Sequence, residues 1–264
     1  MSGEGQTDEL LYSVEDGIAR ATFNRPQARN ALTFAMYEGL AALCGRINDD
    51  PEVRALVISG AGGKAFAAGT DIGQFRSFST PQDPIDYEHR IDRILSTLES
   101  CRVPTIASVV GACTGGGAAI AACCDLRIAS ADARFGFPIA RTLGNCLSQT
   151  SLARLSALIG PSRVKEMIFT ARLLEADEAR SVGFLHEVVP DAAALEARTT
   201  ALARTVAGHA PLTLRATKEG LRRLQPGGAG GEGEDLILMC YTSADFREGI
   251  EAFLGKRPPR WQGR

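Results

Sequence analysis

The sequence predicts an α/β protein with a layered core, followed by a helical C-terminal part. Continuous apolar runs, such as residues 53–60 and 105–111, alternate with segments of helical spacing, which indicates strands that are covered on both faces. From about Gln149 onward the strand signals thin out and helical patterns follow one another. A chain of 264 residues is long enough to bury a substantial core of this kind.

The first elements are predicted by turn chemistry and apolar spacing. Residues 10–23 hold two β-prone runs around Asp16-Gly17, which predicts a hairpin. A turn-rich loop follows over residues 24–33, and residues 34–47 have the apolar spacing of a helix.

The middle of the chain repeats a strand and a glycine-rich loop. The run 53–60 predicts a buried strand that ends at the Gly- and Ala-rich loop 60–72. An amphipathic helix is expected from Pro84 to Glu99, and a second buried strand, 105–111, leads into "GACTGGGAAIAACCD". The next two runs predict short strands, "DLRIAS" and "ARFGF".

The C-terminal part is expected to be helical. "QPGGAGGEGE", residues 225–234, is expected to be a flexible insert, because one long helix is predicted after it over residues 235–255. The other segments with helical patterns are residues 151–160, 162–170, 175–183, 194–208 and 212–224.

Composition and charge exclude several classes of protein. The chain is 45% hydrophobic and 23% charged with a net charge of −2, so no basic excess suggests a nucleic-acid partner. No apolar run reaches the roughly 18 residues of a membrane helix, and the polar N-terminus lacks the apolar region of a secretory signal. We therefore expect a cytoplasmic protein without a membrane partner.

The cysteines are expected to be reduced thiols that are mostly buried. There are seven of them with no CxxC pair, and three histidines, so no metal site is expected. Cys146 lies in a stretch that contains Gly and Asn, and we interpret it as a small packing residue.

Both glycine-rich loops follow buried strands, where ligands of parallel α/β sheets bind. Backbone donors at helix starts in such loops would hold a developing oxyanion. The alternative is that Gly and Ala simply permit tight turns and close packing. Neither of these two loops contains GxGxxG, and GxxxxGK[ST] is not found in the sequence, which argues against nucleotide binding by those motifs.

Five motifs, in this order and spacing, resemble the enoyl-CoA hydratase/isomerase (crotonase) superfamily over roughly residues 10 to 262. They are "NRPQARNALT", "KAFAAGTDI", "GACTGGGAAIAACCDLRIAS", "ARFGFP" and "DFREGIEAFLGKRPPRW". The resemblance implies a crotonase-like spiral of ββα units over residues 1–190, which would carry the site, and a helical trimerisation region over residues 191–264. It also implies an acyl-CoA substrate, a place in fatty acid metabolism, and a homotrimer or a dimer of trimers. Coenzyme A would arrive as part of the substrate, with no other cofactor.

The same resemblance implies roles for single residues. Thr70 and Gly116 match the two backbone N–H donors of the oxyanion hole, which polarise the thioester carbonyl and stabilise an enolate. The residues that match the region cradling coenzyme A are Arg25, Arg29, Lys64, Ala68, Asp71 and Ile72, together with Phe253 and Lys256 on the last helix. Asp71 is also expected to cap its loop. For Arg25, Lys64 and Lys256 the alternative is that they are solvated surface charges without a ligand.

The chain departs from the family where a hydratase has its two glutamates. The position after the glycine run is Ala119, and the position after the FGxP-type turn is Ile139, or Ala140 with a different gap. None of these side chains transfers protons, so ordinary hydration by two carboxylates is not expected, although overall resemblance favours the name enoyl-CoA hydratase.

Other groups are candidates for acid–base chemistry. Asp86, Glu88 and His89 lie on the helix after the first loop, and His89 is the first choice because imidazole titrates near neutrality; a solvated helix face is the alternative. Arg141 and Asn145 lie in the loop that normally carries the second glutamate. Arg141 is a candidate to bind a carboxylate on the acyl chain, and Asn145 matches the area where a dehalogenase relative has its nucleophilic Asp, although Asn is not a useful nucleophile.

Three classes of function therefore stay open. The first is an acyl-CoA enzyme, an isomerase, decarboxylase or thioester hydrolase with a different acid–base residue. The second is an acyl-CoA binder without catalysis, and the third is a structural role for the trimer.

Overall fold

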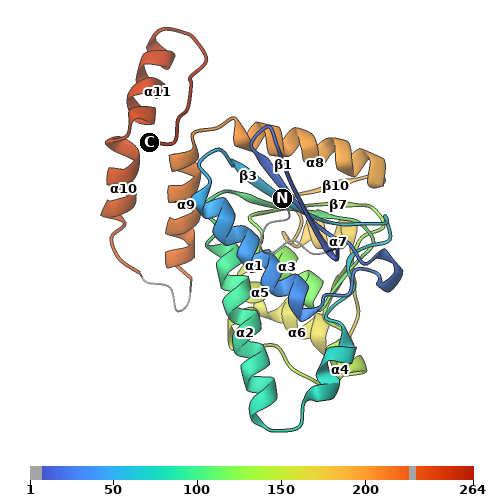
Figure 1. Ribbon diagram of the computed structural model, residues 1–264. Helices are drawn as coiled ribbons and strands as arrows, with labels where there is room; N and C mark the ends of the chain where they lie inside the picture. Colours follow the sequence, from blue (N-terminus) through green and yellow to red (C-terminus); the bar gives the residue numbers. More distant parts are fainter. Residues whose placement is uncertain (1–7, 226–229) are drawn as a thin grey trace.

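The computed structural model describes residues 8–225 and 230–264, and this part of the chain forms two sheets (Figure 1). The larger sheet has the order β1-β2-β3-β5-β7-β10 and is parallel except for the β1/β2 hairpin. Its strands are β1 (Leu10–Glu15), β2 (Ile18–Phe23), β3 (Ala55–Gly60), β5 (Thr105–Val109), β7 (Leu126–Ser130) and β10 (Glu187–Val189).

The smaller sheet has the order β4-β6-β8-β9, in which only the β8/β9 pair is antiparallel among the described residues. Its strands are β4 (Ala65–Ala67), β6 (Ala112–Thr114), β8 (Arg134–Gly136) and β9 (Leu174–Glu175). After the β1/β2 hairpin, the strand pairs β3/β4, β5/β6 and β7/β8 each add one strand to the larger sheet and one to the smaller sheet before a helix follows. This is the spiral of ββα units that the resemblance implied.

Helices cover both faces of the larger sheet. Helix α8 (Ala192–Ala207) packs its Ala203 against Ile18, Val57 and Ile106 on one face, although it lies in the predicted C-terminal region. The other face joins the main core beneath helices α1 to α3, as Figure 1 shows. The remaining core elements are α1 (Phe34–Asp49), α2 (Gln82–Glu99), α3 (Gly116–Cys123), α4 (Ile139–Thr142), α5 (Gln149–Ile159), α6 (Pro161–Thr170), α7 (Ala176–Ser181) and the 3₁₀ turns η1 (Pro26–Ala28) and η2 (Ile72–Ser77).

The C-terminal helices extend away from this core (Figure 1). They are α9 (Pro211–Arg223), α10 (Glu234–Tyr241) and α11 (Ala244–Leu254). Helix α9 is tied to the core because the Lys218 ammonium lies 2.7 Å from the carboxylate of Asp125. The same carboxylate accepts hydrogen bonds from the backbone N–H and the hydroxyl of Thr105, so Asp125 joins three segments of the fold.

Several elements differ from the sequence predictions. The single helix expected over residues 235–255 is wrong, because the chain breaks at Thr242 and Ser243, where the Ser243 hydroxyl caps α11 by accepting from the Phe246 N–H at 3.0 Å. Strands β4 and β6 lie inside the predicted glycine-rich loops, and β9 and β10 lie where only helices were expected. Residues 226–229 of the predicted insert lie outside the described residues.

Candidate active site

The first predicted donor, Thr70, lies just after β4. Leu32 donates its N–H to the Gly69 carbonyl, and the Asp71 N–H donates to the Leu32 carbonyl, both at 2.8 Å. This is a parallel bridge between Leu32 and Thr70. Because successive N–H groups of an extended chain point to opposite sides, the N–H of Thr70 points away from Leu32, and it donates to no backbone carbonyl within the described residues.

The second predicted donor, Gly116, is the first residue of α3. The helix makes its first backbone bond from the Ala119 N–H to the Gly115 carbonyl at 2.9 Å, so the Gly116 N–H has no acceptor within the helix. Gly115 has φ +51°, a conformation that favours glycine. A Cβ placed on Gly115 would lie 3.4 Å from the Cα of Gly69, so the two glycine-rich segments are in contact.

Thr70 and Gly116 both line one cavity of about 210 Å³. Helix α2 closes one side of it through Tyr87, Glu88 and Ile91. The volume is below the roughly 300–1,000 Å³ of a typical small-molecule pocket. It therefore suits one end of a large ligand rather than the whole of one.

A chain of three hydroxyls fixes the Thr70 side chain. Its oxygen lies 2.9 Å from the Tyr37 hydroxyl and 3.2 Å from the Tyr87 hydroxyl. Burial raises the pKa of both tyrosines, so both stay protonated at neutral pH. Three hydroxyls carry three protons for two mutual hydrogen bonds, which leaves one O–H free to donate elsewhere. Sequence reasoning missed this network, because Tyr37 and Tyr87 lie on different helices.

The positions of the missing glutamates are apolar walls of the same cavity. Ala119 and Ile139 line it, and only 8% of the Ile139 side chain is exposed. Ala140, the alternative match, is exposed and does not line the cavity. The structure therefore favours Ile139 as the position that faces the site.

The three acid–base candidates on α2 lie on different sides of the helix. Glu88 lines the cavity and is half-buried, whereas Asp86 and His89 are exposed and do not line it. Burial raises the pKa of the Glu88 carboxyl, and the charge of Asp92 one turn later raises it further. The structure thus brings Glu88, rather than His89, to Thr70 and Gly116.

The segment after α4 contributes two polar side chains. Asn145 and Cys146 both line the cavity, while Arg141 is exposed and does not. The prediction that Cys146 is a buried packing residue is wrong, because its thiol is exposed. The buried cysteines, as expected, are Cys44, Cys101, Cys113, Cys123 and Cys124.

Most of the residues predicted to cradle coenzyme A gather beside Thr70. The Ala68 N–H donates to the Arg29 carbonyl at 3.0 Å, and Ala68 lines the cavity. The Arg25 guanidinium lies 3.0 Å from the Asp71 carboxylate, whose other oxygen accepts the Gly73 N–H and caps η2. This confirms that Asp71 caps its loop.

Exposed groups lie around this ion pair. The Ile72 side chain is 56% exposed, and Arg29 and Lys64 are exposed. Within the described residues neither Arg29 nor Lys64 forms an ion pair, so both cations are available to a ligand.

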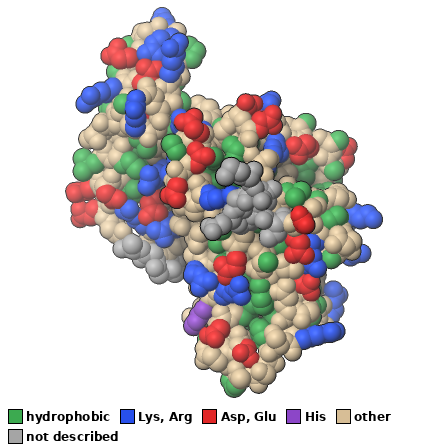
Figure 2. All heavy atoms as spheres, viewed as in Figure 1, with side chains coloured by type: hydrophobic (Ala, Val, Ile, Leu, Met, Phe, Trp, Pro, Cys, Tyr) green, Lys and Arg blue, Asp and Glu red, His purple; other side chains and the backbone are tan. Residues whose placement is uncertain are grey.

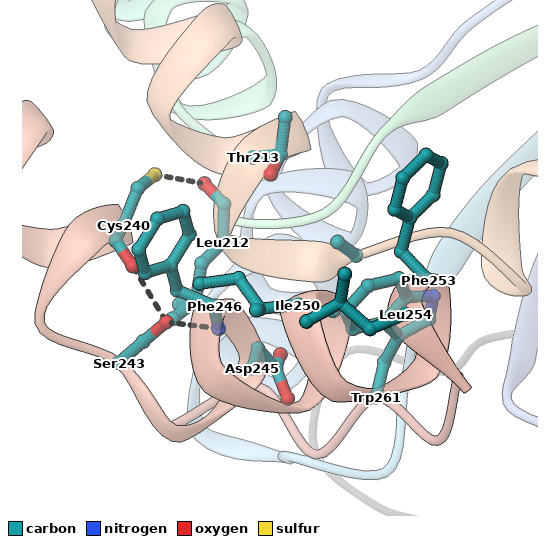
Figure 3. Close-up of a pocket in the computed structure, with 12 residues that line it drawn as sticks. Leu212, Thr213, Cys240, Ser243, Asp245, Phe246, Ile250, Phe253, Leu254 and Trp261 are labelled. Atoms are coloured by element: carbon teal, nitrogen blue, oxygen red, sulfur yellow. Dashed lines mark hydrogen bonds between the residues drawn. The ribbon is translucent and has the colours of Figure 1, made fainter.

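Phe253 and Lys256 are not brought to this site within one chain. Phe253 borders a separate cavity of about 410 Å³ between α9, α10 and α11 (Figure 3). Apolar side chains such as Phe246 and Ile250 line that cavity, and the Asp245 carboxylate there already accepts the N–H groups of Gln262 and Gly263. The cavity therefore offers packing surface rather than acid–base groups.

The surface and the remaining side chains add little further chemistry. On the face drawn in Figure 2, basic and acidic side chains are interspersed rather than gathered into patches of one sign. Among the described residues no helix is long and apolar enough to cross a membrane. No group of three or more His, Cys, Asp or Glu in that part of the chain is placed to hold a metal ion.

Comparisons with known proteins agree with this geometry. A family model described as enoyl-CoA hydratase/isomerase matches residues 13–264. The short-chain-enoyl-CoA hydratase of Clostridium acetobutylicum is 32% identical over 257 residues, covering 96% of this chain and 97% of that protein. A putative enoyl-CoA hydratase of Thermus thermophilus is 34% identical over 258 residues, covering 95% and 100%. The crystal structure of an enoyl-CoA hydratase/carnithine racemase from Magnetospirillum magneticum matches with a TM-score of 0.92 and 32% identity, covering 98% and 97%.

Proposed function

This chain belongs to the enoyl-CoA hydratase/isomerase family, and we propose that it acts on an acyl-CoA thioester by stabilising its enolate. The thioester oxygen would accept hydrogen bonds from the backbone N–H groups of Thr70 and Gly116. Each such donor typically contributes about 2.7–4 kcal/mol to the stability of the transition state.

One observation carries this proposal. The Thr70 N–H is turned away from its bridge partner Leu32, and the Gly116 N–H begins α3 without an intrahelical acceptor. Both residues line one cavity. Two backbone N–H donors in a largely apolar pocket stabilise the charged oxygen of an enolate more than the neutral carbonyl. This difference lowers the activation barrier for enolate formation.

We propose that this site does not catalyse ordinary hydration. Adding water across a 2-enoyl thioester uses one group to activate the water and another to deliver the α-proton. Ala119 and Ile139 occupy the two positions that matched those groups, and neither side chain transfers a proton. Isomerisation, decarboxylation and thioester hydrolysis require fewer acid–base groups and fit the pocket better.

A protein that binds acyl-CoA without catalysis is the second candidate. The same apolar pair, Ala119 and Ile139, favours it, because a pocket that only binds has no need of carboxylates there. Turnover separates the two candidates, whereas binding of acyl-CoA separates both from a purely structural role.

The ligand and the assembly are part of the proposal. Arg25, Arg29, Lys64, Ala68 and Ile72 would contact coenzyme A, which enters as part of the substrate. The C-terminal helices would form a homotrimer or a dimer of trimers in the cytoplasm, with Phe253 and Lys256 reaching the coenzyme A of a neighbouring subunit. In support, Phe253 is 84% exposed and Leu254 71% exposed.

Calorimetry with butyryl-CoA, followed by a turnover assay on a panel of acyl-CoA thioesters, tests the proposal. Binding together with turnover of at least one thioester supports it. Binding without any turnover supports the second candidate instead, and a failure to bind any acyl-CoA contradicts both.

A further inference from the structure

Helix α2 presents a single carboxylate to the cavity that contains Thr70 and Gly116. Tyr87, Glu88, Ile91 and Leu95 line the cavity, at the spacing of one helical face. Among the residues that line it, Glu88 is the only Asp or Glu. Its sequence neighbour His89 and the nearby Asp86 are exposed on other sides of the helix.

Glu88 lacks the partners that other half-buried acids of this protein have. Within the described residues no hydrogen bond or ion pair is formed by its carboxylate, whereas Glu99 and Glu38 each face an arginine. Apolar side chains, among them Ile91, Ala119 and Ile139, make up much of the cavity lining. A carboxylate held unpaired in apolar surroundings costs stability, and such groups gather at functional sites.

The alternative is that Glu88 is an ordinary charged residue on the solvated face of α2. In that case the side chain would be expected on the same side as Asp86, which accepts a hydrogen bond from Gln82 at 2.7 Å and is exposed. Glu88 instead shares the cavity with both free backbone donors. The charged and titratable groups nearby are Tyr37 from α1, Tyr87 and Asp92 from α2, and Cys146 from the segment before α5.

We infer that Glu88 is the acid–base residue of this site and moves the substrate proton from α2, in place of glutamates on α3 and α4. The inference rests on the proposed function. With one carboxylate, the reaction class that fits is a proton shift along a 3-enoyl-CoA, which needs a single group to take up a proton and return it.

The step balances without any co-reactant. The Glu88 carboxylate takes the proton from C2, and the C–H electron pair forms the C1=C2 bond as the thioester oxygen becomes negative. The N–H groups of Thr70 and Gly116 hold that oxygen. The protonated Glu88 then returns the proton to C4, where the π electrons of C3=C4 form the new C–H bond. The π electrons of C1=C2 become the C2=C3 bond as the carbonyl reforms from the negative oxygen, and a 2-enoyl-CoA leaves.

Two assays on the full chain test this inference. One follows exchange of the C2 protons of butyryl-CoA in D₂O by NMR, and the other follows conversion of 3-hexenoyl-CoA into the absorbing 2-enoyl thioester. Glu88→Gln should lower both rates by about 10²–10⁴-fold, the usual contribution of a positioned acid–base group. Glu88→Asp keeps a carboxylate on a shorter stem and should retain part of the activity.

Asp86→Asn and His89→Asn are matched controls on the exposed sides of the same helix, and both should stay within about twofold of the wild type. Calorimetry with butyryl-CoA should give Glu88→Gln a Kd close to that of the wild type. A folded Glu88→Gln variant that keeps more than a tenth of both rates overturns the inference and leaves the proposed function standing. A wild-type protein that binds butyryl-CoA but catalyses neither reaction also overturns it, whereas a wild type that binds no thioester contradicts the proposed function itself.

Discussion

A methyl group on Gly116 would collide with the hydroxyl chain behind the proposed oxyanion hole. The added Cβ would lie 1.8 Å from the Tyr37 hydroxyl oxygen, 3.1 Å from Tyr37 Cζ and 3.1 Å from the Thr70 hydroxyl, where ordinary contacts are 3.4–4 Å. Tyr37 is only 1% exposed, so its hydroxyl cannot swing out into solvent and can shift only within the interior, against the cavity that it lines. Gly116→Ala therefore forces either the tyrosine or the start of α3 to shift.

The expected losses of stability and activity in Gly116→Ala follow from the groups that the new methyl group displaces. Overpacking of a buried site costs about 1–3 kcal/mol of unfolding free energy. A displaced Gly116 N–H should also lower kcat by about 10²–10³-fold, as the loss of one oxyanion donor does elsewhere. Urea unfolding and the butyryl-CoA exchange assay measure the two effects separately.

Tyr37→Phe supplies the decisive comparison. Alone it removes the hydrogen bond to Thr70 and should cost about 1 kcal/mol, while Thr70 keeps its contact with Tyr87 at 3.2 Å. Combined with Gly116→Ala it removes the oxygen at 1.8 Å and leaves only the milder 3.1 Å contacts. The double variant should therefore lose at least about 1 kcal/mol less than the sum of the single variants.

Gly45→Ala is the control, because a Cβ at this position in α1 meets nothing within 4 Å. It should stabilise the protein by about 0.5–1 kcal/mol, as the replacement of a glycine inside a helix usually does. Additive losses for Gly116→Ala and Tyr37→Phe, within about 0.5 kcal/mol, would refute the steric reasoning.

Three further changes have defined outcomes. Burial raises the pKa of the Glu88 carboxyl in the folded state, so the folded protein binds the carboxyl proton more tightly than the unfolded chain does. The free energy of unfolding therefore falls as the pH rises from the unfolded pKa near 4.5 through the folded pKa. Glu88→Gln should thus unfold at a higher urea concentration than the wild type at pH 7, and this advantage should vanish below about pH 4. Glu99→Ala leaves the Arg154 guanidinium, whose side chain is 6% exposed, without its carboxylate, and should cost about 3–5 kcal/mol in urea unfolding. Glutamates introduced together at Ala119 and Ile139 should produce hydration of crotonyl-CoA, seen as bleaching of its absorbance.

The sequence predicted the backbone of the site better than its side chains. Thr70 and Gly116 were placed by the resemblance of two short motifs to the family, and the structure brings both residues to one cavity, while their role as donors stays a prediction. Glu88 and His89 differ by one residue, which turns a side chain by about 100° around a helix. Only the packing of α2 against the cavity decides which of them faces inward, and titration behaviour alone favoured His89.

The errors in the predicted secondary structure also have physical causes. The break before α11 was readable, because Ser243 followed by Ala244 and Asp245 is a typical helix start, but the apolar spacing on either side hid it. Strands β9 and β10 are two and three residues long, too short to show any periodicity. Their place depends on pairing with β8 and β7, which is information from distant parts of the chain.

Two reactions of one preparation decide between enolate chemistry and hydration at this site. Exchange of the C2 protons of butyryl-CoA in D₂O reports enolate formation, and loss of the crotonyl-CoA absorbance reports hydration. Exchange without hydration is expected, since the cavity offers two backbone donors and one carboxylate. Hydration at about 10 s⁻¹ or faster, the middle of the usual range of enzyme turnover, would contradict it.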